Sequence, residues 1–285
     1  MKYLCALMLL LAFATPAHAD VTVSVSSIIH YGKDAKQVVQ VYQPDICKNA
    51  SCPVTLWVHG GGWKHGDATQ GTATNMLTKW AQQGIVMVGV NYRLAPQVVH
   101  PAEAQDIAGA INWVYHNINQ YGGDAQRISL LGHSAGAHLV ALVGTNPAYL
   151  GAYNLSPGKN LANVFPIDTA SFDLTKPSAF VQPMIENAFG TDKAVLKEAS
   201  PIWNVHAGGS YPPFIMAATK VRSDAVSTSR LLKKELRDAG GSADLLIVDY
   251  PGASQLKAHG NIAKDLANLN CTLTKTLLAR VLTGQ

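Results

Sequence analysis

The sequence is poor in charged residues. Aspartate, glutamate, lysine and arginine make up only 14% of its 285 residues, and the formal net charge is +4 at pH 7. The lysines and arginines are scattered along the chain, so we expect no basic patch of the kind that binds nucleic acid or anionic lipid. Few charges beside 48% apolar residues are typical of a sheet that helices cover on both faces.

Apolar runs long enough to cross a membrane are also missing. The run from Leu4 to Phe13 is shorter than the roughly 20 residues that span a bilayer. It follows Lys2 and precedes an A-x-A site at Ala17–Ala19, which is the pattern of a secretory signal peptide. We therefore expect residues 1–19 to be a signal peptide and residues 20–285 to form one domain. The mature protein is expected to be periplasmic or secreted, without stable membrane association.

Cysteine is scarce, with four residues in the chain, one of them inside the expected signal peptide. No C-x-x-C pair or histidine-rich tract offers metal ligands, and we expect neither a metal nor a cofactor. Cys47 and Cys52 are separated by four residues of a polar turn, and export favours a disulfide between them. Two free thiols are the alternative. Cys271 would then be unpaired, as a small apolar residue of a C-terminal helix.

The chain alternates buried strands with amphipathic helices. An antiparallel edge hairpin is expected at 21–29 and 37–42, then strands at 54–58, 85–90, 128–131, 164–167, 213–218 and 245–250, and helices at 72–83, 101–114, 183–189, 192–199, 227–239 and 260–282. Such alternation predicts an α/β fold with a mostly parallel sheet and helices on both faces. Ligands of such sheets bind at the carboxyl ends of the strands.

The strand at 128–131 leads into Gly132–Gly136, which reads GHSAG and continues with helical spacing. A strand, a sharp turn and a helix around G-x-S-x-G predict a nucleophile elbow. Side chains at the two glycine positions would collide with the flanking strand and helix. The helix N-terminus would direct the N–H of Ala135 at negative charge beside Ser134. Ser134 is the predicted nucleophile, and a chance match of a short motif is the alternative.

A second glycine cluster, His59–Trp63 (HGGGW), ends the buried strand at 54–58. Three successive glycines are unfavourable in backbone entropy, so something must require them. We infer a bare backbone whose N–H groups approach a ligand closely. A merely flexible loop is the alternative.

A serine nucleophile needs a base, and the order expected along the chain is nucleophile, acid, histidine. His259 follows the last strand by the loop 251–258 and is the predicted base. His138 lies within the helix of the elbow and is expected to face away from the hydroxyl. His206 precedes a glycine loop before the next strand.

The acid that orients this base is expected after the strand before the last. Asp224 lies six residues beyond Ala218, ahead of a helix, and is the predicted acid. Asp173, after the earlier strand, is the rival. Asp168 and Asp192 fit less well.

Four ordered motifs resemble the α/β-hydrolase fold, and more narrowly small carboxylesterases of the hormone-sensitive-lipase and bacterial feruloyl-esterase kind. They are His59–Trp63, Asn91–Pro96 (NYRLAP), Gly132–Gly136 and Ser200–Pro201, in a similarity that runs from about Val54 to the end. The resemblance implies Ser134, Asp224 and His259 as nucleophile, acid and base.

The same resemblance implies that Gly61 and Gly62 donate to an oxyanion together with Ala135, and we expect Trp63 and His133 to contact substrate. The chain departs from the family's usual pattern at residues 220–223, where a glycine is usual, and in a longer loop before the base. The segment ahead of the HGGGW motif is too short for a long cap, so little or no cap is expected.

These features predict an exported serine hydrolase that cleaves carboxylic esters of small or aromatic substrates through an acyl-enzyme, with a small-molecule ester as its partner. An arylformamidase would use the same triad on an amide. A serine peptidase of related fold normally needs a large extra domain, for which there is no room. A non-catalytic binding module on the same scaffold would be expected to lose a triad member, and none is lost. The sequence does not indicate an oligomeric state.

Overall fold

A computed structural model describes residues 21–284, so the expected signal peptide (1–19) lies outside the described residues. Their sheet has nine strands in the order β1-β3-β5-β4-β6-β7-β8-β9, with β2 also paired to β3. All pairs from β5 through β9 are parallel, whereas β1, β2 and β5 pair with β3 antiparallel. The predicted edge hairpin and mostly parallel sheet are confirmed. The strands are β1 (Val23–Val25), β2 (Ile29–His30), β3 (Val38–Pro44), β4 (Cys52–Val58), β5 (Val86–Val90), β6 (Gly123–His133), β7 (Asn163–Ile167), β8 (Phe214–Thr219) and β9 (Ala243–Val248).

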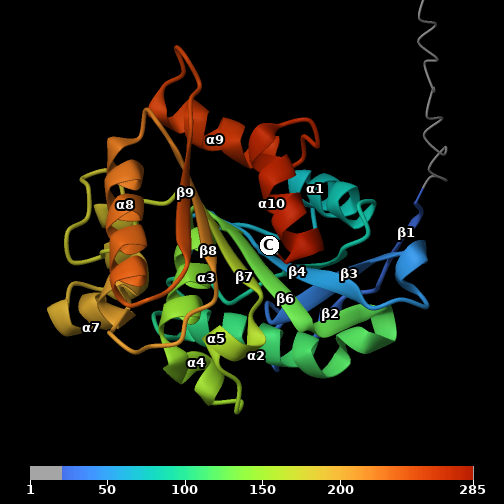
Figure 1. The fold of residues 1–285 in the computed structure, drawn as a ribbon. Helices are drawn as coiled ribbons and strands as arrows, with labels where there is room; N and C mark the ends of the chain where they lie inside the picture. The colour runs from blue at the N-terminus through green and yellow to red at the C-terminus, as the bar shows by residue number, and fades with distance from the viewer. Residues whose placement is uncertain (1–20, 285) are drawn as a thin grey trace, which may run out of the picture.

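Helices cover both faces of this sheet (Figure 1). One face packs against α2, α3 and α8, and the other against α1, α9 and α10. The short helices α4 and α5 lie in the segment between α3 and β7, for which the sequence pattern predicts no element. The helices are α1 (Thr72–Ala81), α2 (Ala102–Asn117), α3 (Ala135–Thr145), α4 (Pro147–Gly151), α5 (Pro157–Asn160), α6 (Gln182–Phe189), α7 (Lys193–Glu198), α8 (Ser223–Asp238), α9 (Gln255–Asp265) and α10 (Thr272–Thr283), with 3₁₀ turns η1 (Asp45–Cys47), η2 (Ile118–Tyr121) and η3 (Pro201–Asn204).

Strand β4 shows why a central strand carries apolar side chains on both of its faces. Successive side chains of a strand point to opposite faces of the sheet. Val54, Leu56 and Val58 therefore belong to one hydrophobic core, whereas Trp57 belongs to the core on the other face. Burial on both faces fixes the positions of the strand ends, and with them the loops that carry the site.

Cys47 and Cys52 form a disulfide, with their Cα atoms 5.7 Å apart. The bond joins η1 to the first residue of β4, and the predicted pairing is confirmed. Cys271 is a free thiol at the edge of a core cluster, where it is partly rather than fully buried.

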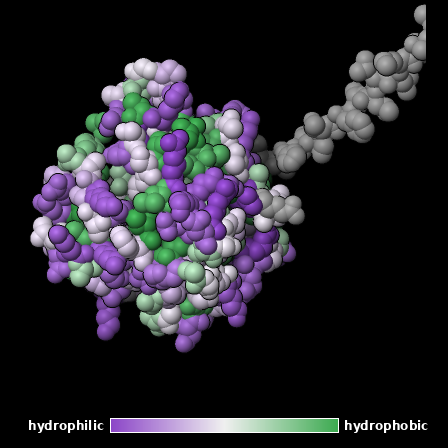
Figure 2. All heavy atoms as spheres, turned by 60° about the vertical axis from the view of Figure 1, so that its left-hand side comes forward, coloured by the Kyte–Doolittle hydropathy of each residue, from purple (hydrophilic) through white to green (hydrophobic). Residues whose placement is uncertain are grey.

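Among residues 21–284, none of the helices combines the length and the apolar character needed to cross a bilayer. On the face seen in Figure 2, apolar side chains form separate patches between polar ones.

One acidic group lies inside the apolar core. Glu103, on α2, is 1% exposed, and neither of its carboxyl oxygens has a hydrogen-bond partner among the described residues. Burial disfavours the charged form and raises the pKa of Glu103 to about 7 from an ordinary value of 4.5. Between these two values only the unfolded chain gives up the proton, so the free energy of unfolding falls as the pH rises from about 4.5 to about 7.

The Glu103→Gln variant carries no titrating group at this position. Its free energy of unfolding is therefore expected not to fall in this way between pH 4.5 and 7. The quantity to compare is the free energy of unfolding of the variant minus that of wild type. This difference should be larger at pH 8 than at pH 4.5 by on the order of 2–3 kcal/mol. Urea unfolding at both pH values measures the difference. Glu186→Gln, which alters an exposed carboxylate on α6, is the control and should change little. A difference between Glu103→Gln and wild type that stays constant with pH would contradict the prediction.

Candidate active site

Ser134 lies in the sharp turn between β6 and α3. Its backbone has φ 56° and ψ −121°, a conformation that side chains rarely adopt. A Cβ on Gly132 would come within 2.3 Å of the Gly136 carbonyl oxygen, and a Cβ on Gly136 within 2.1 Å of the Val58 oxygen. Both glycines are therefore required by contact with the flanking backbone. The predicted elbow geometry is confirmed, with the serine at the carboxyl end of a central strand.

The HGGGW loop approaches this elbow from the end of β4. Gly61 and Gly62 have φ values of 112° and 61°, in the region that favours glycine. A Cβ on Gly60 would lie 2.9 Å from the Cβ of Ser134, so only bare backbone fits there. Within the described part of the chain, the N–H groups of Gly61, Gly62 and Ala135 make no hydrogen bond. All three residues line the same cavity as Ser134, which makes their N–H groups available to a ligand.

The segment after β5 fixes this loop. The Tyr92 hydroxyl donates to the His59 carbonyl oxygen at 3.0 Å, and the two rings stack with centroids 4.5 Å apart. A ring nitrogen of His59, Nδ1, lies 2.7 Å from the Gly60 oxygen. The side chain of Asn91 donates to Asp67 at 2.9 Å. The loop is thus held in place before any ligand binds, as an oxyanion site requires.

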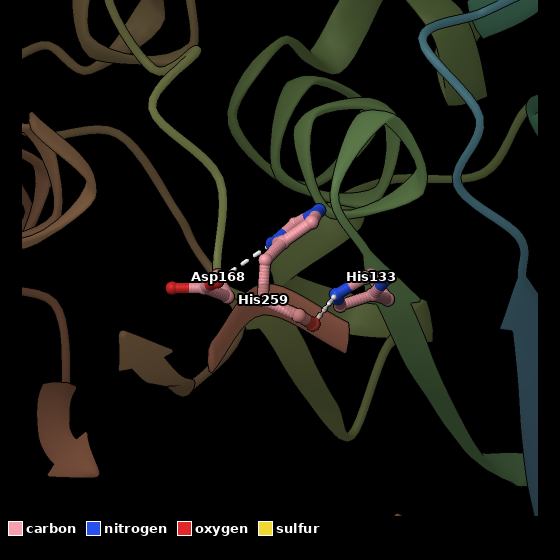
Figure 3. Close-up of side chains that lie close together, drawn as sticks. All are labelled: His133, Asp168 and His259. Atoms are coloured by element: carbon pink, nitrogen blue, oxygen red, sulfur yellow. Dashed lines mark hydrogen bonds and ion pairs between the residues drawn. The ribbon is translucent and has the colours of Figure 1, made fainter. Parts of the chain in front are cut away.

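His259 reaches the site from α9. The helix starts at Gln255, behind the cap of Ser254, so His259 lies within the helix rather than at the end of the expected loop 251–258. Its Nδ1 is 2.7 Å from Oδ2 of Asp168 (Figure 3). The ring and the Ser134 hydroxyl line one cavity, although no hydrogen bond of that hydroxyl is present among residues 21–284. Such bonds are often long before substrate binds.

Asp168 follows directly on β7 and is fully buried. Its Oδ1 accepts from the N–H and hydroxyl of Thr219 at 2.8 and 3.1 Å, and its Oδ2 accepts from Arg222 at 3.0 Å besides His259. Burial alone would raise the pKa of Asp168. The hydrogen bond from His259, the charge of Arg222 and the Thr219 N–H outweigh burial and hold this pKa well below its usual range. The carboxylate is therefore ionised at neutral pH.

The expected contact between Asp224 and His259 is not formed, so this prediction is wrong. Asp168 contacts His259 instead. Asp224 lies in the first turn of α8, where it accepts from the Ser178 hydroxyl at 3.0 Å and from the Ala225 N–H at 2.8 Å. The turn between β8 and α8 instead directs Arg222 toward the site. The carboxylate that contacts His259 thus comes from one strand earlier than predicted.

The other two candidate acids have local roles. Asp173 accepts hydrogen bonds from the N–H and hydroxyl of Thr175 and from the indole of Trp203. Asp192 caps the N-terminus of α7. One signal could have pointed to Asp168: it is an acidic residue that immediately follows a fully buried strand, where burial demands partners from elsewhere in the chain.

The two residues expected to contact substrate lie in the cavity wall, each with further contacts. Trp63 is 2% exposed, and its ring packs edge-on against His138 and Phe189, so the indole offers almost no free surface. The ring of His133 lies 4.4 Å from that of His259, and its Nε2 lies 3.2 Å from the His259 backbone oxygen (Figure 3). Burial, with the nearby His259, lowers the pKa of His133, so this ring is neutral at neutral pH.

His133, Asp168 and His259 are also the kinds of residue that bind metals, and their ligand atoms lie within 4.8 Å of one another. Nδ1 of His259 and Oδ2 of Asp168 are already bonded to each other. The cationic side chain of Arg222 contacts both residues, which disfavours a further cation. This arrangement fits a proton-transfer pair better than a metal site.

The cavity around Ser134 has a volume of about 460 Å³. Its outer wall is formed by Phe180, Val181 and Met184 and by Leu256 on α9. The first three lie in the segment that connects β7 to β8. Phe180 and Leu256 are 60% and 70% exposed, so this part of the apolar wall lies at the mouth of the cavity, whereas Val181 is buried.

The BD-FAE family profile matches residues 39–236. Esterase LipQ of Mycobacterium tuberculosis is 30% identical over 246 residues, which cover 80% of this chain and 56% of LipQ. Esterase LipC of the same organism is 31% identical over 242 residues, which cover 76% of this chain and 59% of LipC. The chain therefore spans little more than half the length of these two relatives.

Among solved structures, esterase B from Lactobacillus rhamnosis matches with a TM-score of 0.73 and 22% identity, over 92% of this chain and 85% of that one. This likeness concerns the fold, which is the α/β-hydrolase fold expected from the motifs. Because the family profile covers most of the chain, including the glycine loop, the elbow and Asp168, the chain belongs to the BD-FAE family.

Proposed function

We propose that this protein is a serine hydrolase that cleaves carboxylic esters through an acyl-enzyme. The observation that carries the proposal is the hydrogen bond of 2.7 Å between His259 and the buried Asp168, beside the strained elbow of Ser134 and three N–H groups that line its cavity. These are the base, the orienting acid, the nucleophile and the oxyanion donors that acyl transfer needs. LipQ and LipC, which bear the name esterase, add support.

In the proposed first step, Oγ of Ser134 attacks the ester carbonyl carbon while Nε2 of His259 takes the proton of this hydroxyl. The carbonyl oxygen becomes an oxyanion that accepts hydrogen bonds from the N–H groups of Gly61, Gly62 and Ala135. Removing one such donor lowers kcat by about 10²–10³ in a well-studied hydrolase. Asp168 stabilises the imidazolium while it exists.

The tetrahedral intermediate then collapses. The bond to the leaving oxygen breaks, and the alcohol departs with the proton held on Nε2 of His259. Water enters, gives a proton to the same nitrogen and attacks the acyl carbon of the acyl-enzyme. A second collapse releases the carboxylic acid and returns the proton to Ser134, so the cycle closes without another reactant.

The proposed substrates are small or aromatic esters. A volume of about 460 Å³ lies toward the lower end of the range of small-molecule sites, roughly 300–1,000 Å³. The apolar side chains Phe180 and Leu256 lie at the exposed mouth, where they can flank a short acyl chain or a ring but cannot enclose a long chain.

We expect kcat/KM on p-nitrophenyl esters to be highest for short acyl chains and to fall for longer ones. Each further CH₂ contributes about 0.8 kcal/mol only where it finds buried apolar wall. The series from acetate to palmitate, with a hydroxycinnamate methyl ester as the aromatic probe, measures this. A profile that rises steadily to long chains, with activation at a lipid interface, would contradict the proposed substrate class. Faster turnover of an N-formyl aromatic amine than of any ester would favour amide hydrolysis instead.

We also propose that the protein works in an oxidising compartment, periplasmic or extracellular. The disulfide between Cys47 and Cys52 supports this, because disulfides persist in exported proteins and are rare in the reducing cytosol.

A further inference from the structure

Arg222 occupies the turn between β8 and α8, and its side chain is only 5% exposed. Its Nη1 lies 2.9 Å from the backbone oxygen of Asp168, 3.0 Å from Oδ2 of the same residue and 2.8 Å from Nδ1 of His259. Its Nε is 3.8 Å from Oδ1 of Asp224. One buried guanidinium therefore contacts both members of the pair and also lines the cavity of Ser134.

The hydrogens on these atoms limit what the pair can do. Nη1 carries two hydrogens, and two oxygens of Asp168 lie at bonding distance from it. When both hydrogens go to Asp168, the hydrogen between Nδ1 and Oδ2 belongs to His259, and Nε2 keeps the lone pair that a base needs. If Nδ1 accepted a hydrogen from Arg222 instead, Nε2 would carry a hydrogen and could not take the serine proton.

The charge of Arg222 also acts on the ring of His259. The other titratable groups near the ring are Asp168 from the end of β7, the neutral His133 from β6 and His65, which follows the HGGGW loop and lines the same cavity. A guanidinium stays protonated at every working pH. It disfavours a second positive charge on the adjacent imidazole, whereas the carboxylate of Asp168 favours it.

We propose that Arg222 is a positioning residue that holds Asp168 against His259 and sets the pH range in which the pair acts. The inference rests on the proposed ester hydrolysis. Arg222 acts through its two neighbours and makes no contact with the reacting atoms. The two effects are separable, because lysine keeps the charge without the planar fork, whereas glutamine keeps a donor without the charge.

The test measures kcat/KM on p-nitrophenyl acetate from acidic to alkaline pH for wild type, Arg222→Gln and Arg222→Lys. Arg222→Gln is expected to lower the plateau about 10- to 100-fold and to move the acid limb to higher pH by about half a unit or more. Arg222→Lys is expected to lower the plateau and leave the acid limb in place. Lys220→Gln removes an exposed charge two residues earlier and should change neither.

A folded Arg222→Gln variant with the wild-type plateau, or with the wild-type acid limb, overturns the proposal. Circular dichroism and thermal melting establish folding. If Arg222→Gln does not fold, Arg222→Lys decides: a lowered plateau with an unmoved limb supports the proposal, and a wild-type plateau overturns it. Failure of the proposed function is distinguishable, because the wild-type protein would then hydrolyse no ester.

Discussion

Ser134→Ala is expected to lower kcat on a short p-nitrophenyl ester by a factor on the order of 10⁴ or more. The alanine keeps the Cβ, so the elbow conformation with φ 56° remains, and only the attacking oxygen is lost. Oxyanion donors and substrate contacts survive in this variant, which is why some activity above the uncatalysed rate should remain. Thermal melting should show a folded protein.

A fluorophosphonate probe gives a second measure of the same prediction. Wild-type protein should take up one equivalent, and the Ser134→Ala variant none. Ser227→Ala, an exposed serine on α8, is the matched control and should keep both activity and labelling. Near-wild-type turnover by Ser134→Ala would end the assignment of the nucleophile, whatever the probe shows.

Asp168→Asn is expected to lower kcat by on the order of 10⁴, whereas Asp224→Asn should stay within a few-fold of wild type. The amide that replaces the Asp168 carboxylate would direct a donor at Nδ1 of His259, which favours the tautomer with hydrogen on Nε2. That tautomer cannot accept the serine proton. Asp224 touches no reacting group. In Asp224→Asn the amide oxygen can still accept from the Ala225 N–H, and the amide nitrogen can donate to the Ser178 hydroxyl.

The paired comparison separates the two carboxylates in one assay. Asp168→Asn removes the nearer of the two carboxylates beside the buried Arg222 and leaves Asp224 at 3.8 Å. Breaking a buried ion pair typically destabilises by about 3–5 kcal/mol. The kinetics of Asp168→Asn are therefore measured below its melting temperature, with circular dichroism as the check on folding. A large loss in Asp224→Asn beside near-normal turnover in Asp168→Asn would return the role of the acid to Asp224.

The sequence was sufficient for the features that depend on local pattern. Buried strands such as β4 and β7 are mostly apolar because both faces are covered, and the elbow at Ser134 needs glycines on either side because a side chain there would collide with flanking backbone. Both features depend on residues that are close together in the sequence. The fold and the nucleophile elbow could therefore be predicted from the residues alone.

The acid could not be assigned in the same way. Whether Asp168 or Asp224 reaches His259 depends on two turns at neighbouring strand ends, and the chain positions of both residues satisfy the expected order. Asp168 has a positive φ of 54°, which aspartate tolerates better than most residues, and this conformation is not visible in the residue pattern. Arg222 and Thr219, which complete its surroundings, lie more than fifty residues further along the chain.

Because His259 lies on α9, the expected esterase activity depends on whether this one helix stays packed against the domain. Ala258 and Ile262 are buried beside the sheet, and the hydroxyl of Tyr250 donates to Asp265 at 2.6 Å, so these contacts hold the helix to the domain. Proteins open locally at a lower free energy than they unfold globally, and peripheral helices are often among the first parts to open. Opening of α9 would withdraw the base and leave the nucleophile, its elbow and the nine-stranded sheet in place. Inactivation by mild heat or low urea would then be reversible and would precede the loss of secondary structure.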